Sequence, residues 1–166
     1  MRYTGRKGWQ ASKRDVWSVE NTLCPIIGAT VVKYREESVK DGKFVEGVPV
    51  KFCEELVEND LVKWEDGTSL ILSDEDERIV AEEWLSVIDK IVYAFTAEEP
   101  DIMDYNFSFI KGDKEPEKME DGFTKFNLVC TNKKEQARYI KDGNAHYEKV
   151  EEGYKLFGKW LRDIWL

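Results

Sequence analysis

The chain has 166 residues, of which 42% are hydrophobic and 13% aromatic, including six tryptophans. This is enough apolar material for one buried core, so we expect a single domain over residues 1–166 and exclude disorder over the whole length. A net charge of −9 repels nucleic acid and anionic lipid, which disfavours duplex nucleic acid and membranes as partners.

Charge is unevenly distributed along the chain. Residues 1–14 carry arginine and lysine but no acidic side chain, so the remainder is more acidic than the whole. An acidic body keeps a small protein in solution, and its acidic face can also attract a basic protein.

The three cysteines, Cys24, Cys53 and Cys130, are widely separated and form no Cys-x-x-Cys pair. One of them must stay unpaired within the chain, so a disulfide framework is not expected and a reducing cytoplasm fits. Neither a signal-peptide run nor a membrane-spanning apolar stretch is present in the sequence, so we expect neither secretion by that route nor membrane insertion.

The N-terminal third of the chain predicts an arm followed by a helix. Residues 1–12 predict an irregular basic arm. Residues 13–36 predict a long helix, because Val16, Val19 and Leu23 recur at steps of three and four behind a potential N-cap at Ser12. Pro25 lacks a backbone donor and is expected to kink this helix.

Residues 37–72 predict an insertion and residues 74–97 a second long helix. In the insertion, turn residues leave a loop or a small hairpin equally open near Asp41-Gly42, and a short helix is expected around Phe52 and Leu56. Ser73 is expected to cap the second helix, whose first turn is acidic as the helix dipole favours. Its buried stripe is expected to comprise Trp84, Ile88, Ile91 and Phe95.

Residues 98–144 predict a second insertion. Segments 106–110 and 126–130 alternate with period two, which favours a two-stranded element. Asp142-Gly143-Asn144 resembles a fragment of a calcium loop, but the other ligand positions do not match, and a turn between helices explains it better.

Residues 145–165 predict the third long helix. Its apolar residues step by three and four along one seam: Tyr147, Val150, Tyr154, Phe157, Leu161 and Ile164, with Trp160 and Trp165 beside it. Gly153 and Gly158 weaken a helix but permit close helix crossings, so both are expected at contacts. The predicted fold is therefore mainly α: a bundle of three long helices with shorter helical or irregular insertions and a possible small β-hairpin.

No catalytic residue, metal site or cofactor is predicted. The only histidine, His146, lies in a polar setting and is expected at the surface, and one histidine with scattered cysteines offers no zinc-ligand spacing. All-α nucleotide pyrophosphohydrolases hold magnesium with paired acidic residues. The acids of this chain lack that spacing. A magnesium-dependent all-α nucleotide hydrolase is therefore kept only as an alternative. The acids concerned are Glu82, Glu83, Asp89, Glu148, Glu151 and Glu152.

The strongest candidate binding residues lie where the arm meets the first helix. Guanidinium and aromatic groups in the arm suit phosphates and bases, which suggests a small anionic nucleotide as one ligand. The start of the helix either caps and packs that helix or forms a recognition patch with Trp17 as its anchor. The candidate residues are Arg6, Trp9, Arg14, Asp15, Trp17, Ser18 and Glu20.

Three blocks of the sequence resemble a widespread family of small uncharacterised bacteriophage proteins. The blocks are Arg14-Asp-Val-Trp-Ser-Val-Glu-Asn21, Val87-Ile-Asp-Lys-Ile-Val-Tyr-Ala-Phe95 and Glu152-Gly-x-x-Leu-Phe-Gly-Lys-Trp160. They are similar to the family's Asp-Val-Trp-Ser-Leu-Asp, Ile-Leu-Asp-Lys-Met-Ile-x-Ala-Phe and Leu-Phe-Gly-Lys-Tyr patterns, although Val19-Glu20 stands where the family usually has Leu-Asp.

The resemblance implies a phage origin and a helical core, and it implies no activity. By analogy with small phage proteins, we expect a non-catalytic accessory protein that binds and inhibits or sequesters a host component, for example one of anti-phage defence, in the host cytoplasm. The alternative is a sponge for a small anionic nucleotide. The sequence leaves open whether the chain forms a homo-oligomer.

Overall fold

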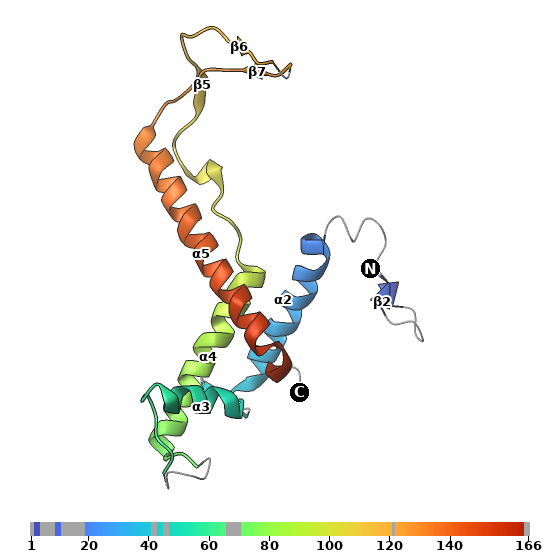
Figure 1. Ribbon diagram of the computed structural model, residues 1–166, viewed down its shortest axis with the longest axis vertical. Helices are drawn as coiled ribbons and strands as arrows, with labels where there is room; N and C mark the ends of the chain where they lie inside the picture. Colours follow the sequence, from blue (N-terminus) through green and yellow to red (C-terminus); the bar gives the residue numbers. More distant parts are fainter. Residues whose placement is uncertain are drawn as a thin grey trace. The chain divides into compact units, whose positions relative to one another are not determined.

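The computed structural model describes residues 2–3, 9–10, 19–40, 43–44, 47–65, 71–120 and 122–164, with the backbone alone at 2–3, 9–10, 19–22 and 43–44. The fold is mainly α, which confirms the predicted class (Figure 1). Its helices in the described ranges are α2 (Val19–Ser38), α3 (Val50–Glu58), α4 (Asp74–Thr96), α5 (Lys133–Ile164) and the short 3₁₀ helix η2 (Ile102–Asp104). None of the described helices has the length and apolar character that a bilayer crossing requires.

The chain forms two compact units, each described here by itself. The helical unit comprises residues 1–97 and 149–166, and the ribbon unit comprises residues 98–148. The ribbon unit therefore covers the predicted insertion 98–144 and four further residues. Helix α5 contributes its first half to the ribbon unit and its second half to the helical unit.

The core of the helical unit lies between α2, α3, α4 and the end of α5. Trp84, Ile88 and Ile91 of α4 are almost fully buried, as their spacing predicted. Phe52 of α3 and Trp160 of α5 enclose Trp84, with ring centroids 5.0 Å and 5.4 Å from that of Trp84. Such edge-to-face packing adds to the burial of apolar area, so this aromatic trio joins three helices at the centre of the unit.

Helix α4 begins as its sequence predicts. The hydroxyl of Ser73 accepts a hydrogen bond from the backbone N–H of Asp76 at 3.2 Å, and the first turn is acidic throughout. Both features satisfy the free N–H groups and the positive dipole of the helix start. The predicted N-cap and the short helix α3, with Phe52 and Leu56 buried, are confirmed.

The prediction that the last helix starts at residue 145 is wrong, because α5 begins at Lys133. The side chain of Asn132 accepts a hydrogen bond from the N–H of Glu135 at 3.3 Å, which caps the new start. Asp142-Gly143-Asn144 consequently lies inside the helix and is not a turn. Tertiary contacts of this first half, described below, override its weak local helical signal.

The buried face of α5 coincides only in part with the predicted seam: of the seam residues, Ile164 is buried and Phe157 packs against the core. In the helical unit the buried positions of α5 are Gly153, Trp160 and Ile164, whereas Tyr154 and Leu161 are exposed. The reason lies at Gly153, where an added Cβ would collide with the carbonyl oxygen of Lys90 and lie 2.5 Å from the Cβ of Ala94 on α4. The predicted close crossing at Gly153 is therefore confirmed. The prediction at Gly158 is wrong, since no atom of the described residues beyond its own surroundings in the helix lies within 4 Å of its Cβ position.

Short antiparallel strand pairs complete the fold. Strand β3 (Val39–Lys40) pairs with β4 (Lys43–Phe44), which settles the open choice near residue 41 in favour of a hairpin. Strand β1 (Arg2–Tyr3) pairs with β2 (Trp9–Gln10), so the expectation of a wholly irregular arm is wrong. In the ribbon unit, β5 (Phe109–Lys111) pairs with β8 (Leu128–Cys130), which confirms the two-stranded element, and β6 (Glu117–Lys118) pairs with β7 (Thr124–Lys125).

Candidate functional site

The binding residues predicted from the sequence lie outside the part of the chain that the structure describes. Arg6, Arg14, Asp15, Trp17 and Ser18 are not described, and the side chains of Trp9 and Glu20 are not described either. The structure therefore neither assembles nor separates this set.

Four of the six acidic side chains considered for magnesium form ion pairs with basic side chains. Asp89 accepts a hydrogen bond from the guanidinium of Arg35 on α2, and Glu152 accepts one from Lys90 at 2.8 Å. Glu151 pairs with Lys155 one turn along α5, and this contact lowers the pKa of Glu151. In the described ranges no three acidic, histidine or cysteine side chains are placed to hold a metal ion.

His146 is not a surface residue, contrary to the prediction from its polar neighbours. Its side chain is buried within α5, and its ring centroid lies 5.6 Å from that of Tyr147 in an edge contact.

A groove on the helical unit lies between α4 and α5, with a volume of about 490 Å³. Lys149 lies over the ring of Tyr93 on one side, at 5.5 Å from its centroid. The lining carries three carboxylates and two lysines; it comprises Glu82, Leu85, Ser86, Asp89, Lys90, Tyr93, Lys149 and Glu152. The carboxylates make this groove a poor receptor for an anionic nucleotide.

The most distinctive surface of the described chain is the β5–β8 ribbon of the ribbon unit. Its register pairs Phe109 with Cys130, Ile110 with Val129 and Lys111 with Leu128. Residues directly opposite each other in an antiparallel pair share a face, and neighbours along a strand alternate. One face of the ribbon therefore carries Phe109 and Leu128, and the other carries Ile110 and Val129.

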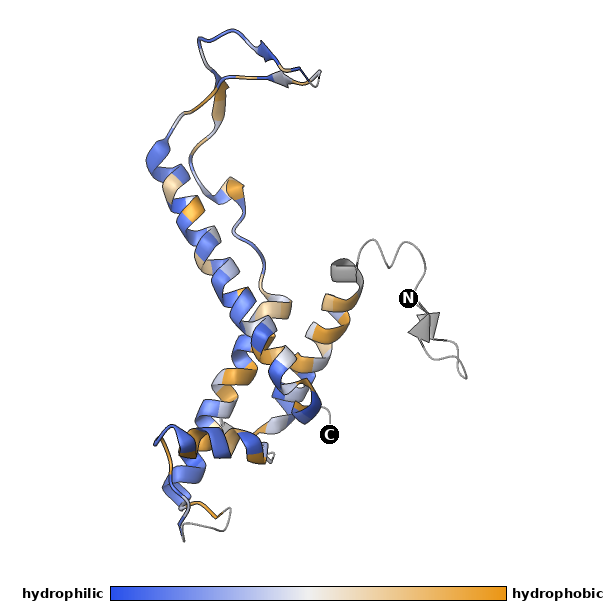
Figure 2. Ribbon diagram, viewed as in Figure 1, coloured by the Kyte–Doolittle hydropathy of each residue, from blue (hydrophilic) through white to orange (hydrophobic). Residues whose placement is uncertain are grey.

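Both faces of this ribbon are apolar and open. The exposed fractions are 48% for Phe109, 54% for Ile110, 58% for Leu128 and 43% for Val129. Figure 2 shows β5 as an apolar stretch within a mostly hydrophilic region of the chain. A two-stranded sheet is marginal in water unless a further strand or a packed surface covers it. Large apolar side chains exposed on both faces of such a sheet mark an interaction surface.

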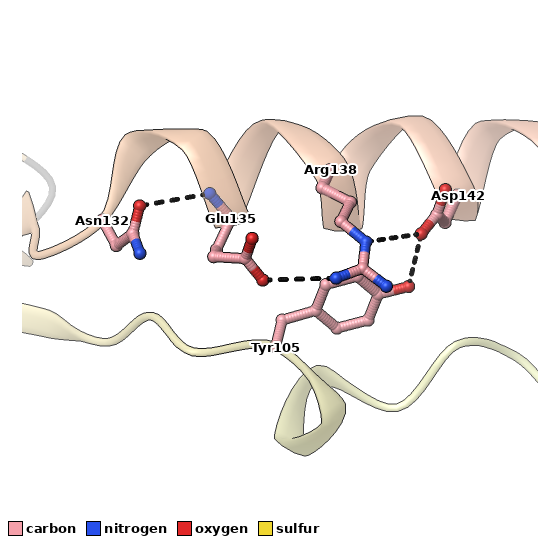
Figure 3. A network of polar contacts seen from close by, with 5 residues as sticks. All are labelled: Tyr105, Asn132, Glu135, Arg138 and Asp142. Atoms are coloured by element: carbon pink, nitrogen blue, oxygen red, sulfur yellow. Dashed lines mark hydrogen bonds and ion pairs between the residues drawn. The ribbon is translucent and has the colours of Figure 1, made fainter.

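The segment before β5 is attached to α5 by the contacts in Figure 3. The hydroxyl of Tyr105 donates a hydrogen bond to Asp142 at 2.8 Å. Arg138 lies over the Tyr105 ring, 5.3 Å from its centroid, and forms ion pairs with Glu135 at 3.6 Å and Asp142 at 3.8 Å. The hydrogen bond to the carboxylate of Asp142 raises the pKa of Tyr105, because ionisation would place a second negative charge beside it.

Aromatic contacts continue this attachment towards the ribbon. The ring of Tyr139 on α5 lies 5.2 Å from that of Tyr105 and 5.8 Å from that of Phe107, and Phe107 in turn contacts Phe109 at 5.9 Å. The first half of α5 thus serves as a support from which the ribbon projects. Sequence periodicity located both strands, but it could not tell that their apolar side chains stay exposed among the described residues.

Comparison with known protein families, with curated proteins and with solved structures finds no match. The candidate site therefore rests on the geometry of the ribbon alone.

Proposed function

We propose that this chain is a non-catalytic binding protein that captures a protein partner through the β5–β8 ribbon. The observation that carries the proposal is the exposure of Phe109, Ile110, Leu128 and Val129 on a two-stranded sheet held out on α5. A single scattered apolar side chain on a surface needs no explanation, but a contiguous set on both faces of one element does.

As part of this proposal, the protein is phage-encoded and acts on a host protein in the host cytoplasm, which it inhibits or sequesters. The phage origin is supported by the resemblance of the sequence blocks. Two of those blocks meet in the core: Gly153 lies against Ala94, and the ring of Phe157 lies 4.9 Å from that of Phe95. Such residues maintain the helical unit, which leaves the ribbon unit free to specify the partner.

The described surfaces support protein binding by the ribbon better than they support a nucleotide sponge or a magnesium-dependent hydrolase. A nucleotide sponge needs a cationic pocket, whereas the described α4–α5 groove is lined by three carboxylates. A magnesium-dependent hydrolase needs free carboxylates, whereas Asp89 and Glu152 are paired with basic groups.

Affinity capture from a host lysate, with quantitative mass spectrometry, tests the proposal. The variants Ile110→Thr and Leu128→Thr each remove an apolar side chain from one face of the ribbon and keep a strand-compatible residue. Ile26→Thr is the matched control, because Ile26 is an exposed isoleucine of α2 in the helical unit. Burying one such side chain in an interface contributes about 1.5–3 kcal/mol, which corresponds to about tenfold or more in affinity.

We expect one host protein to be retained by the natural chain and by the Ile26→Thr control, and to be lost from both ribbon variants. Circular dichroism should show that all four proteins keep the same helix content. Equal recovery of the same protein by the ribbon variants would refute the proposal, as would a partner that the Ile26→Thr variant alone loses.

A further inference from the structure

The two edges of the β5–β8 ribbon can be distinguished from its hydrogen bonds. The N–H of Gly112 donates to the carbonyl of Asn127 at 2.7 Å, and the N–H of Thr131 donates to that of Ser108 at 2.9 Å. Antiparallel strands direct alternate residues towards their partner. The backbone groups of Leu128 and Cys130 therefore point outward from β8, and those of Phe109 and Lys111 point outward from β5.

The outer edge of β8 lacks the protection that edge strands usually have. Natural edges carry lysine, proline or a bulge that discourages a further strand. Lys111 supplies such a charge on β5, whereas residues 126–132 contain neither a charged residue nor a proline. In the described part of the chain no third strand pairs with β8. The outward N–H and C=O groups of Leu128 and Cys130 are thus open to strand addition.

The charge around this edge indicates what kind of strand fits. Lys133 and Lys134 lie three and four residues after the end of β8, occupy the first turn of α5 and are exposed. Neither forms an ion pair with any of the described residues. Lysine is unfavourable at a helix N-terminus, because the helix dipole is already positive there. The lysine charges and the positive end of the dipole together attract carboxylates. The end of β8 is therefore locally basic in a chain whose net charge is −9.

We infer that the outer edge of β8 accepts an extended apolar segment of a partner protein as a third strand, with acidic residues beside that segment lying against Lys133 and Lys134. The inference rests on the proposed binding function and specifies its partner chemistry. A second copy of this chain fits less well. The self-pairing register centred on Val129 would bring the start of α5 of one copy, which carries Lys133, towards Lys125 of the other, and these like charges repel.

Fluorescence anisotropy of labelled synthetic peptides with the full-length protein tests the inference. The probe is a short alternating valine–threonine peptide with glutamates at both ends, and its control carries lysines at the ends. Two further probes are N-methylated on alternate amides, one in each phase. A strand that adds to an edge donates only every second N–H to it, so one phase should abolish binding and the other should not.

Matched protein variants identify the edge and the charges. Leu128→Pro removes an outward N–H of β8, Leu128→Ala removes only the side chain, and Lys111→Pro removes an outward N–H of β5; proline at such edge positions is compatible with a strand. Replacing Lys133 and Lys134 together by glutamate reverses the charge beside the end of β8. Glutamate at the start of α5 interacts favourably with the helix dipole, so the variant should still fold.

We expect saturable binding of the glutamate-flanked peptide that one methylation phase abolishes. Leu128→Pro should weaken it about tenfold more than Leu128→Ala does, and Lys111→Pro should leave it unchanged. The charge-reversed variant should prefer the lysine-flanked peptide. The inference is overturned by no binding of the glutamate-flanked peptide, by equal sensitivity to both methylation phases, or by loss with Lys111→Pro alone. A dimer in sedimentation that Leu128→Pro dissociates would also overturn it, in favour of self-pairing.

The failure of this inference can be separated from that of the proposed function. If the captured host protein is lost from Ile110→Thr but retained by Leu128→Pro, the ribbon binds its partner by a face, and strand addition is wrong while the function stands. If no host protein depends on the ribbon, the proposed function is wrong whatever the peptides do.

Discussion

Replacing Gly153 by alanine tests the closest contact between α4 and α5. The Cβ of an alanine at this position would collide with the carbonyl oxygen of Lys90 and lie 2.5 Å from the Cβ of Ala94. Backbone atoms cannot rotate aside as a flexible side chain can, so the two helices must separate. Overpacking of this kind costs about 1–3 kcal/mol, and the better helix propensity of alanine returns about 1 kcal/mol.

Gly158 provides the matched control in the same helix. It is exposed, and none of the side chains that the structure describes comes within 4 Å of its Cβ position, so Gly158→Ala should gain the helix propensity of about 1 kcal/mol without a clash. The two variants should therefore differ in the free energy of unfolding by about 1–3 kcal/mol. In a chain of this length each kcal/mol corresponds to about 2–4 °C in melting temperature.

Thermal unfolding followed by circular dichroism measures this difference directly. We expect Gly158→Ala to melt above the natural chain and Gly153→Ala to melt clearly below Gly158→Ala. If the two alanine variants rise together, Gly153 is not held against α4, and the packing described for the end of α5 is wrong.

Three further outcomes follow from the same structure. Trp84→Ala should lower the free energy of unfolding by about 3–5 kcal/mol, as for other buried large side chains. Trp84→Phe should lower it less, because the indole N–H that it removes lacks a hydrogen-bond partner among the described residues. Equal losses of stability in the two variants would contradict this. Tyr105 should form tyrosinate at higher pH than a free tyrosine, measured as the ultraviolet difference between the natural chain and Tyr105→Phe. Asp142→Ala should move this transition back towards that of a free tyrosine. Because the pKa of Tyr105 is raised in the folded chain, any stability from this contact is present at neutral pH and is lost as pH rises through that pKa. Burial raises the pKa of the Cys53 thiol. In a variant that keeps Cys53 as its only cysteine, alkylation should therefore be slower in the folded chain than in urea at the same pH. Equal rates would place this thiol in solvent.

Local sequence signals predicted the elements that are stable for local reasons. Ser73 and the acidic turn after it satisfy the start of α4, and the stripe of Trp84, Ile88 and Ile91 has one helical face that can be buried. The period-two segments that became β5 and β8 were located as well. In these cases capping, period and burial all point to the same conformation, so the sequence alone is sufficient.

Only the tertiary structure decided which face of α5 is buried and which surface stays open. Two helical stripes overlap along this helix, one through Tyr154 and Leu161 and one through Gly153 and Trp160, and both have the correct spacing. The second is buried because α4 packs directly against Gly153, which has no side chain. Alternation likewise located the strands of the ribbon, but an apolar strand is buried only if another element covers it, and no local pattern contains that information.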